Sequence, residues 1–489
     1  MCPGHCPEYA ATRRWGAKVS HLRLAGPVGL MRLCGAVRGN ACSLRIAGGI
    51  YCRRAHARQR VEKGGLMKFA INFQLGLPRP LDADQWGPDD ERKMYDECCE
   101  LIELADKVGF DYTFLTEHHF SEEYSHNSSP ETILAAVART TKHIRLGHGI
   151  VQMIPAMNHP SRVAERISAL DLLSHGRVEF GTGEGTSDNE LDAFQTPRAM
   201  KKAMWEDATR ETCKMMSQVP YEGFSGEFFS FPSRNVIPKP LQKPHPPLWV
   251  ACSRRETTLM AARFGMGALG FGFETAEEFG ERAEEYYRII REECMPIGGA
   301  INPALQVGNN LMIADTEEEA VLRNGTGPQF GSWVLGYYST SPGTKRDAEG
   351  RSYIEKWQPG VSHLHREWAA EVAAGRIQAP GTKMPTEAEL RAVEPSSEQA
   401  RALFRMARGG AIGTEAMVRE NLLRYEAAHV DMMSFGIFGG NRKFEHVMEA
   451  VERFGKNVMP EFLERHETTH KKWREQQLDG VEFQVNSSI

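Results

Sequence analysis

A carboxylate and two imidazoles stand together at the end of a short apolar segment. The segment Asp111–Phe120 reads DYTFLTEHHF, and its first half, rich in aromatic residues, is typical of a buried strand. Glu117, His118 and His119 do not suit packing there, because polar groups beside an apolar core need partners. An imidazole next to a carboxylate can move protons near neutral pH. Since successive side chains of a strand point to opposite faces, we expect only one of the two histidines to face a site.

Two other stretches combine residue types that suit an anionic ligand. The run Phe180–Gly185 (FGTGEG) has alternating glycines, which let a ligand approach the backbone, although Gly-rich turns are common by themselves. The run Val250–Arg255 (VACSRR) places a serine and two arginines at the expected start of a helix. A phosphate would meet hydroxyl, guanidinium and amide donors there. Arginines that are simply solvated explain the second run equally well.

A metal site is a weaker interpretation of the histidines. Metal catalysis needs three or four ligands that converge on one point. His148 and His159 are the residues that would join His118 in such a site. Metal-dependent hydrolysis therefore remains an alternative, and we assign no metal ligand.

The chain from Met67 onward alternates strand-like and helix-like segments, such as the predicted helix Asp90–Val108. Eight strand–helix units in about 420 residues predict an α/β protein with a (β/α)8 TIM barrel, whose strand ends carry the chemistry. A doubly wound nucleotide-binding sheet fits less well, because Leu75–Pro78 follows the first strand in place of a Gly-x-Gly-x-x-Gly loop. The predicted strands are Lys68–Gln74, Tyr112–His119, Ile144–Val151, Arg177–Gly183, Leu248–Cys252, Gly267–Phe273, Ala304–Ala314 and Val430–Phe438.

A long insertion interrupts this alternation before the eighth strand. It covers about Gly325–Gly413, which is too long for an idle loop in a compact domain. We predict that it contains helices and forms a lid over the barrel mouth. Its aromatic residues, which suit an apolar cover, include Trp333, Tyr337, Tyr338, Trp357 and Trp368.

The ends of the chain differ in composition from its body. Residues 1–66 hold twelve Lys and Arg against two acidic residues, so the net charge of −5 divides into about +10 there and −15 in residues 67–489. We interpret 1–66 as a basic leader, either disordered, a targeting segment or not natively translated, 67–465 as the barrel domain, and 466–489 as a polar tail. The acidic body argues against nucleic-acid binding. The absence of long apolar runs predicts no membrane span, and the scattered cysteines of the body favour the cytoplasm.

Several short motifs, in the same order, resemble the bacterial luciferase-like family of flavin-dependent monooxygenases and related oxidoreductases. They extend over about 400 residues, and their combination is specific where any single motif is not. The matching pieces are Met67-Lys68-Phe69, Gly109-Phe110-Asp111, Glu117–Phe120, His159-Pro160 with Ala164-Glu165, Leu170-Asp171 with Ser174, Gly176-Arg177, Gly181, Gly183 and Val458-Met459-Pro460. The resemblance implies a TIM-barrel enzyme, expected as a homodimer, that uses reduced FMN from a separate flavin reductase and molecular oxygen to oxygenate a small organic substrate.

The resemblance also implies roles for residues near a flavin ring. His118 matches a histidine at the flavin and substrate pocket, and we take Glu117 beside it as a second catalytic candidate. His148, Gly149 and Ile150 belong to a segment that matches a region against the ring, where a non-proline cis peptide is usual.

Phosphate binding is the other role that the resemblance implies. Ser253 matches a serine that contacts the flavin phosphate, and we expect Arg254 or Arg255 to assist it. Gly183 and Glu184 stand where the luciferase catalytic subunit has a Cys-Arg pair, whose arginine helps to hold the phosphate. These departures argue against light emission and long-chain aldehyde substrates. The alternatives are a deazaflavin-dependent dehydrogenase or reductase, a metal-dependent hydrolase, and a non-catalytic partner subunit.

Overall fold

The computed structural model describes residues 67–270, 274–324, 327–338, 357–374, 410–437 and 442–489. The predicted leader, residues 1–66, lies outside the described residues, as do residues 339–356 and 375–409 of the predicted insertion.

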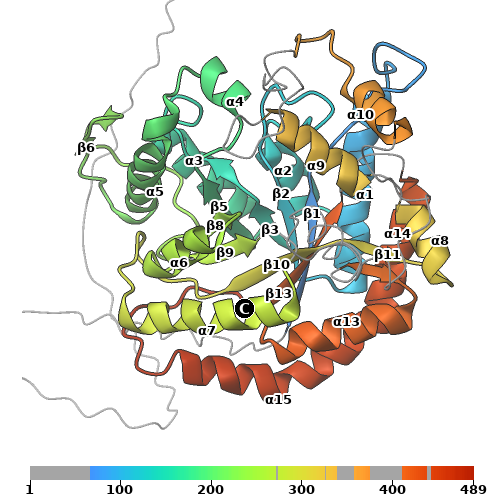
Figure 1. Ribbon diagram of the computed structural model, residues 1–489. Coiled ribbons are helices and arrows are strands. Elements are labelled where there is room, and N and C mark those ends of the chain that lie inside the picture. The colour runs from blue at the N-terminus through green and yellow to red at the C-terminus, as the bar shows by residue number, and fades with distance from the viewer. Residues whose placement is uncertain (1–66, 271–273, 325–326, 339–356, 375–409, 438–441) are drawn as a thin grey trace, which may run out of the picture. The chain divides into compact units, whose positions relative to one another are not determined.

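Eight parallel strands of the described chain close into a barrel (Figure 1). Each strand pairs with the next one in sequence, and the last pairs with the first, so that Ala70 of β1 lies opposite both Tyr112 of β2 and Ser434 of β13. The predicted (β/α)8 barrel with an insertion before its eighth strand is therefore confirmed. The barrel strands are β1 (Lys68–Phe73), β2 (Tyr112–Leu115), β3 (Arg145–His148), β5 (Val178–Gly183), β8 (Leu248–Cys252), β9 (Gly267–Gly270), β10 (Leu305–Asn309) and β13 (Met432–Ile437); β4 (Val151–Gln152) extends the edge of β5.

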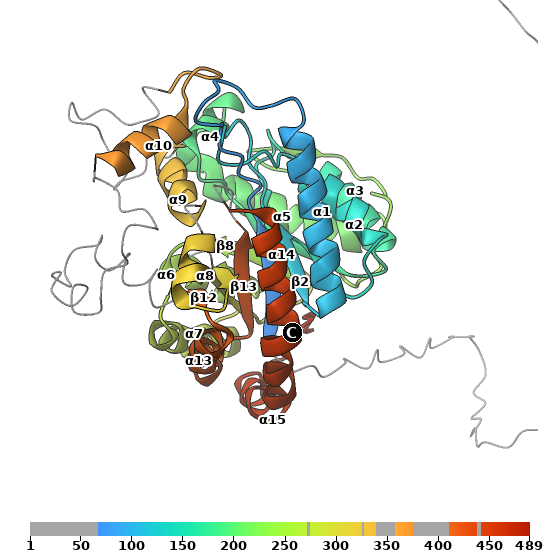
Figure 2. The same ribbon diagram turned by 90° about the vertical axis from the view of Figure 1, so that its right-hand side faces the viewer.

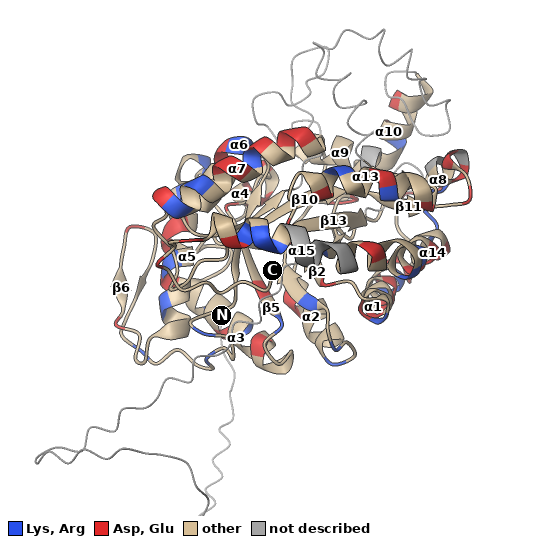
Figure 3. Cartoon of the chain, turned by 90° about the horizontal axis from the view of Figure 1, so that it is seen from below, with Lys and Arg blue, Asp and Glu red and all other residues tan. Residues whose placement is uncertain are grey.

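A layer of helices surrounds the strands (Figure 2). Local sequence explains several boundaries: α1 ends where Gly109 adopts a φ of +100°, and the Thr275 side chain accepts from the Glu278 amide at the start of α7. Acidic and basic residues are interspersed on the outer helices α6 and α7 (Figure 3). The helices of this layer are α1 (Asp90–Val108), α2 (Pro130–Ala138), α3 (Pro160–Leu173), α5 (Lys201–Ser217), α6 (Arg255–Arg263), α7 (Ala276–Glu292), α8 (Glu317–Asn324), α13 (Glu415–Ala427) and α14 (Phe444–Arg453).

Alternation along the strands separates two apolar layers. On β1, Phe69 and Ile71 belong to the large cluster between strands and helices, whereas Ala70 belongs to a smaller cluster inside the barrel. The inner cluster also contains Tyr112, Phe114, Ile150, Trp249, Leu269, Ala304, Met432 and Ile489. The position of a residue along its strand therefore fixes whether its side chain faces the barrel interior.

The amino end of the barrel is covered by the residues that were expected to form a polar tail. Helix α15 (Met459–Gln477) continues past residue 466, and the chain then turns under the strands. Ser488 bonds to the Tyr112 hydroxyl at 2.8 Å and donates to Glu179 at 2.6 Å, while Ile489 joins the inner apolar cluster. Arg474 of α15 fixes this segment by donating to backbone carbonyls of residues 303 and 489. Residues 484–489 are thus part of the barrel's packing.

The described part of the insertion is helical. Helices α9 (Gly327–Tyr338) and α10 (Leu364–Ala373) lie with α4 (Asp188–Ala193) at the end of the barrel opposite α15 (Figures 1 and 2). The predicted strand Ala304–Ala314 is divided into β10 and β11 (Leu311–Ile313), because the Asn309 side chain accepts from the amide of residue 310 at 2.8 Å and breaks the ladder. Strand β11 pairs with β12 (Ala411–Gly413) just beyond the insertion.

Candidate active site

The histidine pair leaves the sheet earlier than predicted. Strand β2 ends at Leu115, because Asn127 binds the backbone just beyond it. The Asn127 side-chain amide donates to the carbonyl of Thr116 at 2.7 Å, and the Asn127 backbone carbonyl accepts from the His118 backbone amide at 2.9 Å. Phe120 and Glu123 in the same loop have positive φ angles of 57° and 62°. The predicted strand Tyr112–His119 is too long, and the expectation that only one histidine faces a site loses its basis, because both lie in a loop, where strand alternation does not apply.

Glu117 organises the site through hydrogen bonds at both of its carboxylate oxygens. One oxygen accepts from His119 Nε2 at 2.9 Å and from Asn158 at 2.7 Å, and the other accepts from the Gln152 amide at 3.0 Å. Burial would lower the pKa of His119, but the hydrogen bond and charge of Glu117 outweigh it and raise that pKa. Glu117, which the sequence analysis names as a catalytic candidate, is therefore placed to orient His119, Asn158 and Gln152.

His118 pairs with Glu190, a carboxylate that the sequence did not single out. Its Nδ1 lies 3.2 Å from Glu190 Oε1, which also accepts from the His119 amide at 2.7 Å and from the Gln152 side chain at 2.9 Å. Glu190 is fully buried, and its Oε2 has no partner among the described residues. Burial alone would raise its pKa, but the charge of His118 and these hydrogen bonds hold it below the usual value.

A local signal for this residue exists in the sequence. Ser187 and Glu190 have the Ser-x-x-Glu spacing that marks a helix start, and Ser187 caps α4 by accepting from the Glu190 amide. The short helix α4 places the Glu190 carboxylate beside the β2 loop.

The described part of the insertion lies against the same loop. The His118 and Tyr124 rings meet edge to face at 5.1 Å between centroids. Tyr124 belongs to an apolar cluster with residues of α9 and α10, which are Phe330, Trp333, Val334, Tyr337, Tyr338, Leu364 and Trp368. This contact connects the aromatic core of the predicted lid to His118.

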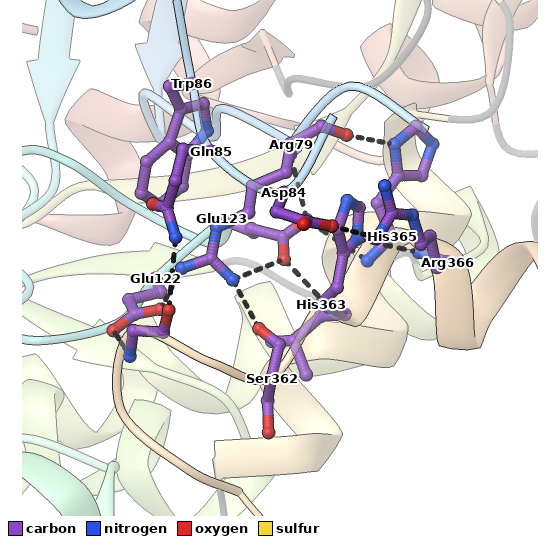
Figure 4. Close-up of polar contacts among 12 residues, drawn as sticks. Arg79, Asp84, Gln85, Trp86, Glu122, Glu123, Ser362, His363, His365 and Arg366 are labelled. Carbon is purple, nitrogen blue, oxygen red and sulfur yellow. Dashed lines mark hydrogen bonds and ion pairs between the residues drawn. The ribbon is translucent and has the colours of Figure 1, made fainter. Parts of the chain in front are cut away.

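A polar network, which we call the latch, holds α10 in this place (Figure 4). Buried Glu123 accepts from the amides of residues 364 and 365 at the start of α10, at 2.8 and 3.1 Å, and from the Arg79 amide at 3.0 Å. The Arg79 guanidinium, also buried, pairs with Glu122 and donates to the carbonyl of Ser362. The latch thus joins the loops after β1 and β2 to the insertion.

The other residues that were predicted to bind the cofactor lie at or just beyond the carboxyl ends of β3 and β5. Their side chains do not all face the same side of the sheet. His148 faces outward, where burial lowers its pKa to about 4. Ile150 faces the barrel interior, and a Cβ on Gly183 would lie 2.7 Å from it. A Cβ on Gly181 would lie 1.9 Å from the His148 carbonyl, so these glycines serve the packing of neighbouring strands.

Gly149 packs on Phe114, and Glu184 pairs with Lys201 at 3.5 Å.

The cis peptide bonds of the described chain all precede proline, at positions 220, 238 and 244. The non-proline cis peptide expected near His148 is therefore not found there.

The predicted phosphate residues divide into two groups. Ser253 follows β8 and Arg254 precedes the first residue of α6; both are exposed, and neither side chain has a hydrogen-bond partner among the described residues. Arg255 is different, because its guanidinium pairs with Glu285 of α7. Ser253 and Arg254 are the pair that a phosphate at this helix start would meet.

The described residues contain no group of three or more His, Cys, Asp or Glu side chains arranged to hold a metal ion. His159 instead caps α3 by accepting from the Ser161 amide. Two stretches with zinc-ligand spacing, HLH at 363–365 and HETTH at 466–470, do occur in the chain. His363 and His365 bond to carbonyls of the loop after β1, and His470 pairs with Asp431 at the barrel's other end.

A cleft of about 800 Å3 lies outside the barrel, between α1 and α14. It is lined by residues such as Phe73 and Met94 and contains none of the candidate catalytic or cofactor-binding residues. No described helix has the length and apolar character needed to cross a membrane.

The described chain thus belongs to the class of TIM-barrel proteins, with a His118–Glu190 pair at the carboxyl end of β2. The profile of the luciferase-like monooxygenase family matches residues 67–432, and the chain belongs to this family. It is 26% identical over 385 residues, 76% of this chain and 91% of the relative, to the oxygenase component of a flavin-dependent trigonelline monooxygenase from Acinetobacter baylyi. It is 38% identical over 109 residues, 21% of this chain and 27% of the relative, to limonene 1,2-monooxygenase from Rhodococcus erythropolis.

Solved structures share the fold at low sequence identity. The oxygenating constituent of 3,6-diketocamphane monooxygenase from Pseudomonas putida, in complex with FMN, superposes with a TM-score of 0.56 at 16% identity, covering 81% of this chain and 98% of that one. A coenzyme F420 dependent tetrahydromethanopterin reductase from Methanopyrus kandleri gives 0.52 at 17% identity, covering 81% and 99%. The relatives support a flavin-dependent oxidoreductase, and the solved structures show its fold.

Proposed function

We propose that this chain is the oxygenase component of a flavin-dependent monooxygenase, using reduced FMN from a separate reductase and molecular oxygen on a small organic substrate. The observation that carries the proposal is His118 paired with buried Glu190 at the carboxyl end of β2, in a barrel of this family. The relative from Acinetobacter baylyi, named as an oxygenase component, supports the separate reductase.

The residues present fit an FMN. Exposed Ser253 and Arg254 offer a hydroxyl and a guanidinium for its phosphate at the start of α6, and Ile150 offers an apolar contact on the inner face for its ring. When bound, reduced FMN supplies the electrons with which oxygen is activated.

His118 is the proton-transfer group in this proposal. Its Nδ1 is held by the Glu190 carboxylate, which leaves Nε2 to give or take a proton. Glu117 and Gln152 hold the loop, and Tyr124 covers one side of the imidazole.

The second candidate is a deazaflavin-dependent dehydrogenase or reductase, which the F420-dependent structural neighbours favour. Fluorescence titration with reduced FMN and with reduced F420, followed by oxygen consumption, separates the two. The proposal requires tighter binding of reduced FMN, and oxygen uptake that depends on it. Preference for F420 without oxygen uptake would replace it by the dehydrogenase.

The proposed phosphate site gives a prediction about the binding of FMN. Replacing Ser253 and Arg254 together by alanine should weaken FMN binding by about ten-fold to a hundred-fold, the effect of losing charge-assisted hydrogen bonds. Riboflavin, which has no phosphate, should bind nearly unchanged in the same titration. Arg255→Ala is the matched control, because its guanidinium already pairs with Glu285. Equal weakening of FMN and riboflavin would move the phosphate site elsewhere.

The latch gives a prediction about the role of the insertion. Arg79→Ala removes the guanidinium that joins Glu122 to the Ser362 carbonyl, so the start of α10 should be held less firmly and admit water to the site. We expect most reduced flavin to be diverted to hydrogen peroxide, measured per flavin oxidised, while flavin affinity changes little. Arg366→Ala, which removes an exposed pair with Asp84 and an exposed hydrogen bond to the Leu81 carbonyl, should stay coupled. Full coupling in the Arg79 variant would show that the insertion does not act as a cover.

A further inference from the structure

Three adjacent strands carry uncharged polar side chains on the inner wall of the barrel. Ala70, Ala304 and Met432 belong to the inner apolar cluster. Two residues further along the same strands come Asn72, Gln306 and Ser434, which alternation places on the same inner face. We call these three residues the polar floor.

The side chains of the polar floor lack partners. Asn72 Oδ1, Ser434 Oγ and both amide atoms of Gln306 have no hydrogen bond within the described chain, although Gln306 is only 1% exposed and Ser434 is fully buried. An unpaired buried polar group destabilises the folded state, because its hydrogen bonds to water are lost without replacement. Such a cost on three neighbouring strands suggests selection for a ligand.

Toward the carboxyl end of the barrel, two residues of the polar floor have no side chain at the next inward position. The next inward positions above Gln306 on β10 and above Ser434 on β13 are Gly308 and Gly436, which have no side chain to cover them. Gly308 and Asn72 are themselves partly exposed. Below the floor, Trp249, Leu269 and Met432 fill the interior. Within β10 and β13, Gln306 and Ser434 are therefore the last side chains on the inner face before the carboxyl end of the barrel, where the proposed reaction site lies.

We propose that the polar floor binds a neutral group that both donates and accepts hydrogen bonds, such as the carboxamide, lactam or imide of the substrate. The Gln306 side chain offers one donor and one acceptor side by side, and the floor contains no charged side chain. A carboxylate would enter without a cationic partner, which burial makes costly. This inference rests on the proposed function, because it names the substrate class of the same site.

The test uses 2,2,2-trifluoroacetamide as a probe, followed by 19F NMR, with trifluoroacetate as the charged comparison. Wild-type protein loaded with FMN should bind the amide and not the acid. Gln306→Leu should weaken amide binding by at least about ten-fold, and Ser434→Ala should weaken it less. Gln476→Leu, on the exposed face of α15, should leave binding unchanged. Stability should not fall in Gln306→Leu, because an unpaired amide is replaced by an apolar group.

Three results would overturn the inference. The first is equal binding of amide and acid, and the second is unchanged amide binding in both Gln306→Leu and a second variant, Gln306→Met. The third is displacement of the amide by FMN, which would show that the imide edge of the flavin, rather than a substrate, occupies the floor. The FMN titration of the same samples is independent: failure of wild-type protein to bind flavin would overturn the proposed function, while the amide signal in flavin-free protein still reports on the floor.

Discussion

Replacing His118 by alanine should lower turnover by about ten-fold to ten-thousand-fold, the range expected when a positioned proton-transfer group is lost. The reason is geometric, because Glu190 holds Nδ1 of this ring and no second imidazole occupies the same place: His119 is bonded to Glu117. The measurement is substrate-dependent oxidation of reduced FMN under saturating oxygen.

Flavin affinity should change much less than turnover in this variant. His143→Ala is the matched control, because His143 is exposed at the start of β3, at the other end of the barrel. Full activity of the His118 variant would remove the proton-transfer role, and an equal loss in both variants would indicate a general effect on folding.

The second large effect should be on stability, at Asp431. This fully buried carboxylate precedes β13 and accepts from the Tyr287 hydroxyl at 2.7 Å, the Leu305 amide at 2.8 Å and His470 at 2.8 Å. Asp431→Ala removes the buried acceptor of these three donors and should lower the free energy of unfolding by about 3–5 kcal/mol, measured by urea denaturation. Asp315→Ala, which removes an exposed partner of Arg453, should cost at most about 1 kcal/mol.

The same carboxylate predicts a pH dependence. Burial would raise the pKa of Asp431, but His470, Arg474 and Tyr287 together hold it below the usual value. A carboxyl whose folded-state pKa is lowered stabilises the fold above its unfolded pKa of about 3.9 and loses that contribution as the pH falls through the folded value. Wild-type stability should therefore fall below about pH 4 more steeply than that of Asp431→Asn. Parallel curves would contradict the assignment.

Much of the barrel could be predicted because its signals are local. Helix α1 and strand β8 begin and end at the predicted residues, since amphipathic spacing with a terminal glycine, and a short apolar run after a proline, leave few alternatives. Strand β2 was predicted too long because its end is set by Asn127, which lies twelve residues beyond Leu115 and folds back. A strand that ends through a distant hydrogen bond has no local mark.

The site was predictable in its residue types but not in its pairings. The position of His118 followed from the chain, whereas its partner Glu190 lies seventy-two residues away on a helix of six residues, too short for a periodic pattern. The sequence gives no means of telling Arg254 from Arg255 as a phosphate ligand. Only the packing of α6 on α7 shows that Arg255 pairs with Glu285. The polar floor could not be predicted from the sequence. Asn72, Gln306 and Ser434 lie on strands that are far apart in the chain and become neighbours only in the folded barrel.

The segment 484–489 under the barrel has a consequence for the order of events in turnover. With Ile489 packed against the inner apolar cluster and Ser488 bonded to Tyr112, residues 488 and 489 fill the amino end of the barrel interior. Under the proposed function, cofactor, oxygen, organic substrate and product would then all enter and leave at the carboxyl end. Product still bound there would block the reduced flavin that the reductase delivers, so slow product release should be observed as competition with incoming reduced flavin.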